Sequence, residues 1–152
     1  MKEIRSEIEI PAPPEEVWEI LTDFPSYPAW NPFIRSIRGE LRVGSRLEVF
    51  IQPPGRRGMM IRPTVLEVEA NRALRWTGRL LMPGIFDGEH RFALVPQGSG
   101  RIRFIQSEIF TGLLVPFTPG LLRNTEEGFL EMNRALRARA EGFSNTYDYP
   151  IR

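Results

Sequence analysis

The sequence predicts an α+β domain in which a run of antiparallel strands precedes one long helix. Between residues 45 and 110, apolar side chains recur at every second position, which is the period of half-buried strands. Short turns rich in glycine and proline separate these stretches. After residue 120 the apolar side chains change to helical spacing, so the main helix is segregated at the end of the chain.

The first elements should be one strand and two short helices. Isoleucines at alternating positions predict a strand over residues 4–10. Pro13 and Pro14 suit the first turn of a helix, which should end at Pro25. A single further turn of helix is expected over residues 28–31, because proline is too frequent there for a longer one.

Six more strands are expected, which gives a sheet of seven. The third of the six contains Pro63, which indicates a bulge or a local break because proline has no N–H for the strand ladder. The expected ranges are residues 33–41, 46–52, 59–69, 73–82, 86–95 and 101–110.

The last predicted element is an amphipathic helix of about 20 residues within residues 121–143. Its apolar stripe consists of Leu122, Thr125, Phe129, Met132, Leu136 and Phe143. We expect one domain over residues 1–143, since a chain of 152 residues is the size of a single domain, and an irregular tail over residues 144–152.

The single histidine, His90, lies in the predicted hairpin of the last two strands. Pairing Val95 with Arg101 places His90 opposite Gln106 and Gly88 opposite Glu108. One face of the hairpin then collects the aromatic side chains, so it should point inward. That face carries His90, Phe92, Leu94, Ile102, Phe104, Gln106, Glu108 and Phe110.

An inward carboxylate needs a partner, because burying an unpaired charge is costly. Arg62 lies on the apolar phase of its strand and is a candidate to approach Glu108. Gly78 and Gly88 occupy inward strand positions, where a glycine either permits sharp curvature or leaves room for another body. A curved sheet around one helix therefore predicts a pocket lined by aromatic and a few polar side chains, as in small-molecule sites.

Four stretches in this order resemble the START-like superfamily, and specifically the polyketide cyclase/dehydrase-type group of SRPBCC domains. They are "IPAPPEEVWEILTDFPSYPAWNPF" (residues 10–33), "GEHRFALVP", "SEIFTGLLVPF" and "GFLEMNRALRARAE". The resemblance covers about residues 3–142. It implies a helix-grip fold, in which a seven-stranded antiparallel sheet wraps around the C-terminal helix and encloses a deep apolar cavity.

This resemblance and the inward face together predict a ligand site between sheet and helix. The candidate ligand-binding residues are Trp30, Arg62, Trp76, His90, Phe92, Phe104, Gln106, Glu108, Leu114, Phe117, Phe129 and Met132. The apolar segment 110–122 is expected either to form a lip of the cavity or to pack over the sheet edge. His90 and Glu108 are the catalytic candidates: they could act as an acid/base pair, or they could satisfy each other structurally.

Three functions follow from the resemblance, whose members bind lipids, sterols, polyketides, quinones or hormones and in a minority catalyse reactions. The first is binding of a small hydrophobic molecule, lipid-like or polycyclic. The second is a cyclase, dehydratase or hydrolase that uses His90 and Glu108 on such a molecule. The third is a protein-interaction module, which predicts an exposed apolar patch instead of a cavity.

Composition argues against several other functions. With no cysteine, a single histidine and no HExxH spacing, we expect neither a metal nor a cofactor. A net charge of +1 gives no basis for nucleic-acid binding. Ser107 points away from His90 by strand parity, which excludes a serine triad. No apolar run suits a signal peptide or a membrane span, so we expect a cytoplasmic protein without integral membrane association.

Overall fold

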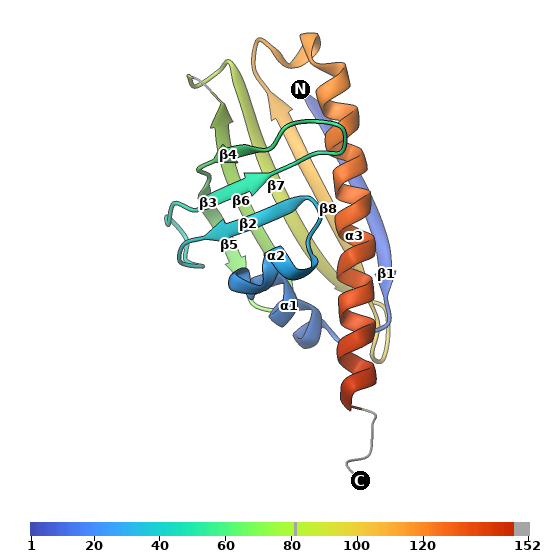
Figure 1. The fold of residues 1–152 in the computed structure, drawn as a ribbon. Coiled ribbons are helices and arrows are strands. Elements are labelled where there is room, and N and C mark those ends of the chain that lie inside the picture. Colours follow the sequence, from blue (N-terminus) through green and yellow to red (C-terminus); the bar gives the residue numbers. More distant parts are fainter. Residues whose placement is uncertain (81, 148–152) are drawn as a thin grey trace.

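Two antiparallel sheets and a long C-terminal helix form the α+β fold in Figure 1, a computed structural model that describes residues 1–80 and 82–147. The larger sheet has the order β1-β8-β7-β6-β5, and the smaller one β2-β3-β4. The strands are β1 (Lys2–Ile10), β2 (Ile34–Arg38), β3 (Glu48–Ile51), β4 (Met59–Ile61), β5 (Thr64–Glu69), β6 (Ala73–Leu80), β7 (Phe86–Pro96) and β8 (Ile102–Thr111).

The helices follow the first strand and the last strand. They are α1 (Pro14–Thr22), η1 (Phe24–Ser26), α2 (Tyr27–Trp30), η2 (Val115–Phe117) and α3 (Pro119–Tyr147). Figure 1 shows α3 running along the sheets while α1 and α2 lie at one end. The predicted α+β class is confirmed, with two short helices after the first strand and the long helix at the end.

The predicted strand over residues 59–69 is two strands, which raises the number from seven to eight. Pro63 separates β4, in the smaller sheet, from β5, in the larger. The carbonyl of Pro63 accepts a hydrogen bond from the N–H of Leu47 (2.8 Å), but proline has no N–H to return. The ladder is therefore interrupted there, and the chain passes from one sheet to the other.

The predicted register of the β7–β8 hairpin was wrong by two residues. Val95 pairs with Arg103 instead of Arg101, and His90 pairs with Glu108 instead of Gln106. Gly98 and Gly100 both have positive φ and centre the turn one position later than expected. A shift of two preserves strand parity, so the predicted inward face is unchanged.

The final helix is longer than predicted. α3 spans 29 residues and reaches Tyr147, so residues 144–147 are helical and not irregular. No proline occurs between residue 120 and Pro150, which explains why the helix continues. The side chain of Phe143 and residues 148–152 lie outside the described part of the structure, so those two predictions are untested.

The core lies between the inner faces of the sheets and the apolar stripe of α3. Phe129 and Met132 are fully buried in it. The ring of Phe33 lies against the helix at Gly128, where an added Cβ would be 2.5 Å from that ring. Gly128 therefore serves close packing between α3 and the segment that leads into β2, which offsets the cost of a glycine in mid-helix.

Candidate functional site

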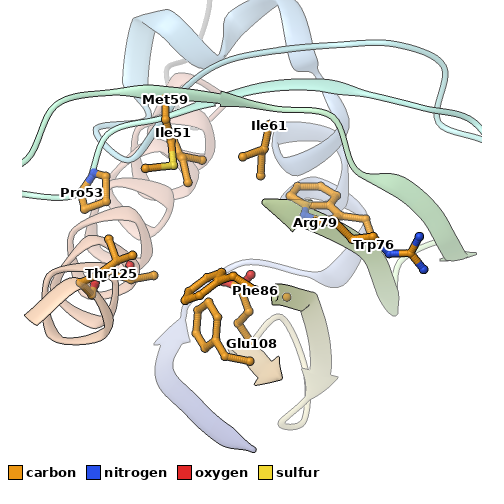
Figure 2. A pocket seen from close by; sticks show the side chains of 13 residues that line it. Ile51, Pro53, Met59, Ile61, Trp76, Arg79, Phe86, Glu108 and Thr125 are labelled. Atoms are coloured by element: carbon orange, nitrogen blue, oxygen red, sulfur yellow. Dashed lines mark hydrogen bonds between the residues drawn. The ribbon is translucent and has the colours of Figure 1, made fainter. Parts of the chain in front are cut away.

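A pocket lies between the two sheets and the amino-terminal part of α3 (Figure 2). Its lining consists of Ile51, Pro53, Met59, Ile61, Trp76, Gly78, Arg79, Phe86, Gly88, Glu108, Phe110, Leu121 and Thr125. The empty volume of the pocket is about 600 Å³ when its open mouth is included. The space open to the centre of a water molecule is about 60 Å³. The pocket is therefore narrow for an organic ligand.

Two paired glycines form the recess in the larger sheet. Gly78 of β6 and Gly88 of β7 are directly opposite each other across the ladder. A Cβ on Gly88 would lie 2.6 Å from Oε1 of Glu108, so the carboxyl group would have to shift. A Cβ on Gly78 would lie 3.7 Å from Cβ of Pro63, an ordinary contact. Gly88 thus makes room for a carboxyl group, whereas Gly78 leaves open space in the pocket.

Glu108 is the charged side chain that enters this pocket among the described lining residues. Its side chain is 16% exposed, and Oε2 lies 3.4 Å from Nδ1 of His90. The other charged residue of the lining, Arg79, directs its guanidinium away from the pocket in Figure 2. The polar end of the pocket is therefore a single carboxyl group.

His90 lies behind the pocket wall and is 4% exposed. Its ring stacks on Trp76 at 5.3 Å between centroids. Phe92 and Phe129 contact other parts of the ring, with centroids at 4.5 Å and 5.0 Å. Because His90 is enclosed by aromatic rings and is not part of the lining, it reaches the pocket only through Glu108.

A chain of buried polar groups continues from the other nitrogen of His90. Nε2 lies 3.0 Å from Oε1 of Gln106. The amide of Gln106 donates to Oδ1 of Asn133 (2.9 Å), and the amide of Asn133 donates to Oγ of Ser6 (2.9 Å). The hydroxyl of Ser6 donates to the backbone carbonyl of Gln106 (3.4 Å). The chain connects β7, β8, α3 and β1, and it satisfies each polar group in turn.

The direction of this chain is fixed by its end. The backbone carbonyl of Gln106 can only accept, so the hydroxyl of Ser6 donates to it and must accept from Asn133. Asn133 then presents its oxygen to the amide nitrogen of Gln106, whose own oxygen faces His90. Because that oxygen can only accept, Nε2 of His90 must carry a hydrogen.

The other nitrogen of the ring faces the carboxyl group of Glu108. Nδ1 lies 3.4 Å from Oε2, which is an ion-pair distance when the imidazole is protonated. An imidazole and a carboxyl group in this arrangement can serve as an acid/base pair, and Glu108 is its member in the pocket.

Eight of the twelve predicted ligand-binding residues fall into three groups. Trp76 and Glu108 line the pocket. His90 and Gln106 lie behind it in the polar chain. The remaining inward side chains are buried in the core and do not line the pocket: Phe92, Phe104, Phe129 and Met132.

Four predicted residues lie elsewhere. Arg62 does not approach Glu108; its side chain is 56% exposed and lies 3.9 Å from Glu48. It alternates with the inward Ile61 and Pro63, and the strand changes phase only at the bulge between Val65 and Glu67. Trp30 packs on Tyr27 with ring centroids 5.2 Å apart. Leu114 and Phe117 are 41% and 79% exposed and do not line the pocket.

An exposed apolar rim lies where the β6–β7 and β8–α3 connections meet. The N–H groups of Leu113 and Leu114 donate to the carbonyls of Gly84 and Ile85, both at 3.0 Å. Met82, Leu113 and Phe117 project there with more than 70% of their surface exposed. The segment 110–122 is thus partly packed and partly open, between the two alternatives that the sequence offered.

Sequence reasoning missed the side of the pocket that the smaller sheet provides. Met59 and Ile61 belong to β4, which forms a wall only because the chain changes sheets at Pro63. It also missed Ser6 and Asn133 of the polar chain. Both had a signal, since each is a polar residue at an inward position of an otherwise apolar face.

Other kinds of site find little support in the described part of the chain. No group of three His, Asp or Glu side chains there has the arrangement of a metal site. No helix within residues 1–80 and 82–147 is both long and apolar enough to cross a membrane.

Comparison with known proteins gives a family and a fold. The family model described as polyketide cyclase / dehydrase and lipid transport matches residues 1–145. A START superfamily protein from Mycobacterium smegmatis is 23% identical, with a TM-score of 0.74 over 93% of this chain and 98% of that one. The Zhui aromatase/cyclase of a Streptomyces species is 15% identical, with a TM-score of 0.75 over 98% and 99%. Among curated proteins, no sequence matches.

Proposed function

Because the chain belongs to the polyketide cyclase/dehydrase and lipid transport family, we propose that it binds a small hydrophobic molecule in the pocket between the two sheets and α3. The supporting observation is the pocket's composition: aromatic and aliphatic walls around one carboxyl group, Glu108. Small-molecule sites typically combine such walls with a few convergent polar groups.

Burial of apolar surface supplies the affinity in this proposal. Each Å² of ligand and wall removed from water contributes about 25 cal/mol. Trp76, Phe86 and Phe110 offer rigid aromatic faces for this contact. Flat or polycyclic ligands suit these walls because they lose little conformational freedom on binding.

Filling the recess tests the proposal. Gly78→Leu places a side chain in the pocket, and the backbone φ at Gly78 does not require glycine. Gly142→Leu is the matched control, because a Cβ there meets nothing within 4 Å. We expect wild type and Gly142→Leu to bind naphthalene equally in equilibrium dialysis, and Gly78→Leu to bind at least about tenfold more weakly. Equal binding by all three proteins would contradict the proposal.

The contact between His90 and Glu108 favours one second candidate, an enzyme of the cyclase, dehydratase or hydrolase type. Glu108 would exchange a proton with the bound molecule. His90 would position the carboxyl group of Glu108 and hold the proton between the two transfers. The test begins with native mass spectrometry and organic extraction of the purified protein. Conversion of a released molecule by wild type but not by Glu108→Gln supports catalysis, and equal conversion by both contradicts it.

A further inference from the structure

We infer that the pocket selects apolar molecules that carry a hydrogen-bond donor, a hydroxyl or an amine, and that it rejects carboxylates. The inference rests on the proposed binding function and specifies its ligand class. It follows from the direction of the buried polar chain, which determines what Glu108 offers to the pocket.

The buried polar chain ends at one of the two carboxyl oxygens of Glu108. Its direction, set by the carbonyl of Gln106, gives Nε2 of His90 its hydrogen. On the other side of the ring, Nδ1 lies 3.4 Å from Oε2 of Glu108. Oε2 therefore faces His90 whether a proton is on the imidazole or on the carboxyl group.

The other oxygen is an acceptor in both cases. If His90 holds the proton, Glu108 is a carboxylate and Oε1 accepts. If Glu108 holds it, the O–H is at Oε2, where it donates to Nδ1, and Oε1 is the carbonyl oxygen, which also accepts. Oε1 lies over Gly88 and has no hydrogen-bond partner among the described residues.

Three other described lining residues carry side-chain donors, and of these the indole N–H of Trp76 is the one that a ligand can meet. The hydroxyl of Thr125 donates to the carbonyl of Leu121 at 2.8 Å. Arg79 directs its guanidinium away from the pocket (Figure 2). Gly88 is paired on both sides within the larger sheet, whereas Gly78 pairs with Gly88 and lies one residue beyond the last β5–β6 pair, Thr64–Thr77.

The selectivity follows from this acceptor. A hydroxyl or amine on an apolar ligand completes the hydrogen bonding of Oε1. A carboxylate ligand places its own lone pairs against Oε1, which has no hydrogen to offer, and loses hydration there. A ligand without any polar group leaves Oε1 unpaired, which is unfavourable in an apolar pocket. Fatty-acid anions should therefore be excluded, whereas alcohols and phenols should be favoured.

Three probes with one ring system test this: 2-naphthol, 2-methylnaphthalene and 2-naphthoate at pH 7. For the wild type, we expect 2-naphthol to bind about tenfold more tightly than 2-methylnaphthalene, and 2-naphthoate at least about tenfold more weakly than 2-methylnaphthalene. Equilibrium dialysis measures all three without a label.

Two variants assign the preference to Glu108. In Glu108→Gln, the amide nitrogen donates to Nδ1 of His90 and the amide oxygen replaces Oε1, so the preference for 2-naphthol should persist. In Glu108→Leu the acceptor is gone, and 2-naphthol and 2-methylnaphthalene should bind within about twofold of each other. Glu108→Gln also guards against misreading a folding defect of Glu108→Leu.

The outcomes separate this inference from the proposed function. If 2-naphthol and 2-methylnaphthalene bind the wild type equally while Gly78→Leu weakens both, the pocket binds apolar molecules but the donor selectivity is wrong. Tighter binding of 2-naphthoate than of 2-methylnaphthalene also overturns the selectivity. If no probe binds the wild type, or Gly78→Leu changes nothing, the binding function itself fails.

Discussion

Gly88 controls where the carboxyl group of Glu108 can lie. Any larger residue places a Cβ 2.6 Å from Oε1, so the carboxyl group must move. Because Oε2 of the same group lies 3.4 Å from Nδ1 of His90, that movement also disturbs the contact with His90. The absence of a side chain at Gly88 thus determines where the polar end of the pocket lies.

Gly88→Ala should therefore abolish the preference for 2-naphthol over 2-methylnaphthalene and reduce the free energy of unfolding by about 1–3 kcal/mol. Gly78→Ala, its cross-strand neighbour, is the control, because its Cβ makes only an ordinary contact at 3.7 Å. Urea denaturation and equilibrium dialysis of both variants measure the two effects. Similar losses in the two variants would show that the clash with Glu108 is not the cause.

Tyr27 provides a pH-dependent test at the same scale. Burial, and to a smaller extent the Asp23 carboxylate, raises the pKa of Tyr27 well above its ordinary value of 10.0. Its hydroxyl donates to the carbonyl of Leu21 at 2.5 Å, a bond that the neutral phenol makes. In the unfolded chain the phenol ionises at its ordinary pKa, so its stabilising contribution is fully present below that pH and declines above it.

We expect the free energy of unfolding of the wild type to fall more steeply above pH 10 than that of Tyr27→Phe. Below that pH, Tyr27→Phe should be less stable by about 0.5–1.5 kcal/mol, because it lacks the hydrogen bond to Leu21. Urea denaturation from pH 7 to pH 11 gives both curves. Parallel curves over the whole range would show that Tyr27 ionises freely in the folded protein.

At the scale of elements, the buried polar chain connects α3 to the sheet at one defined register. Asn133 of α3 lies between Gln106 of β8 and Ser6 of β1. Apolar packing alone would allow the helix to slide, because hydrophobic contacts have no direction. A hydrogen-bonded chain with all members satisfied specifies one position.

A double-mutant cycle of Ser6→Ala and Asn133→Leu measures this connection. Asn133→Leu leaves the amide nitrogen of Gln106 without its acceptor and the oxygen of Ser6 without its donor, and it should cost about 1–3 kcal/mol in the free energy of unfolding. The double variant should be less destabilised than the sum of the single ones, by about 0.5–1.5 kcal/mol, because the two residues share a bond. Additive losses would show that the two side chains act independently.

The sequence predicted the elements better than the site, and Pro63 shows why. Period-two patterns predicted the strands except that β4 and β5 were expected as one, and parity kept His90 and Glu108 on the inward face even with the register wrong by two. That Pro63 transfers the chain to a second sheet is a tertiary event without a local signal beyond the proline itself. The wall formed by β4 follows from it, whereas the outward position of Arg62 reflects the bulge between Val65 and Glu67, which separates its phase from that of Val68.

At the scale of the whole molecule, the pocket is closed by two sheets that face each other. The space that can hold water-sized bodies is about 60 Å³, whereas the hollow with its mouth is about 600 Å³. We expect a naphthalene-sized ligand to make room for itself by moving the smaller sheet away from the larger one. β4 is an edge strand paired only with β3, so this wall is the one held by fewer bonds.

A disulfide across the wall tests this motion. A Cβ at residue 78 would lie 3.7 Å from Cβ of Pro63, within the range of about 3.5–4.5 Å found in disulfides. The chain has no cysteine, so Pro63→Cys with Gly78→Cys introduces only the intended pair. Closing this loop should raise the free energy of unfolding by about 3 kcal/mol.

The oxidised variant should bind 2-naphthol at least about tenfold more weakly than the same protein after reduction, because the cross-link holds the β4–β5 junction against β6. The reduced form is the matched control, since it contains the same two side chains in the pocket. Thermal unfolding confirms that the bond has formed, and equilibrium dialysis in both redox states measures the affinity. If the oxidised protein binds as tightly as the reduced one, the ligand enters without separation of the sheets at this point, and the opening must lie on the side of α3 and the β8–α3 connection.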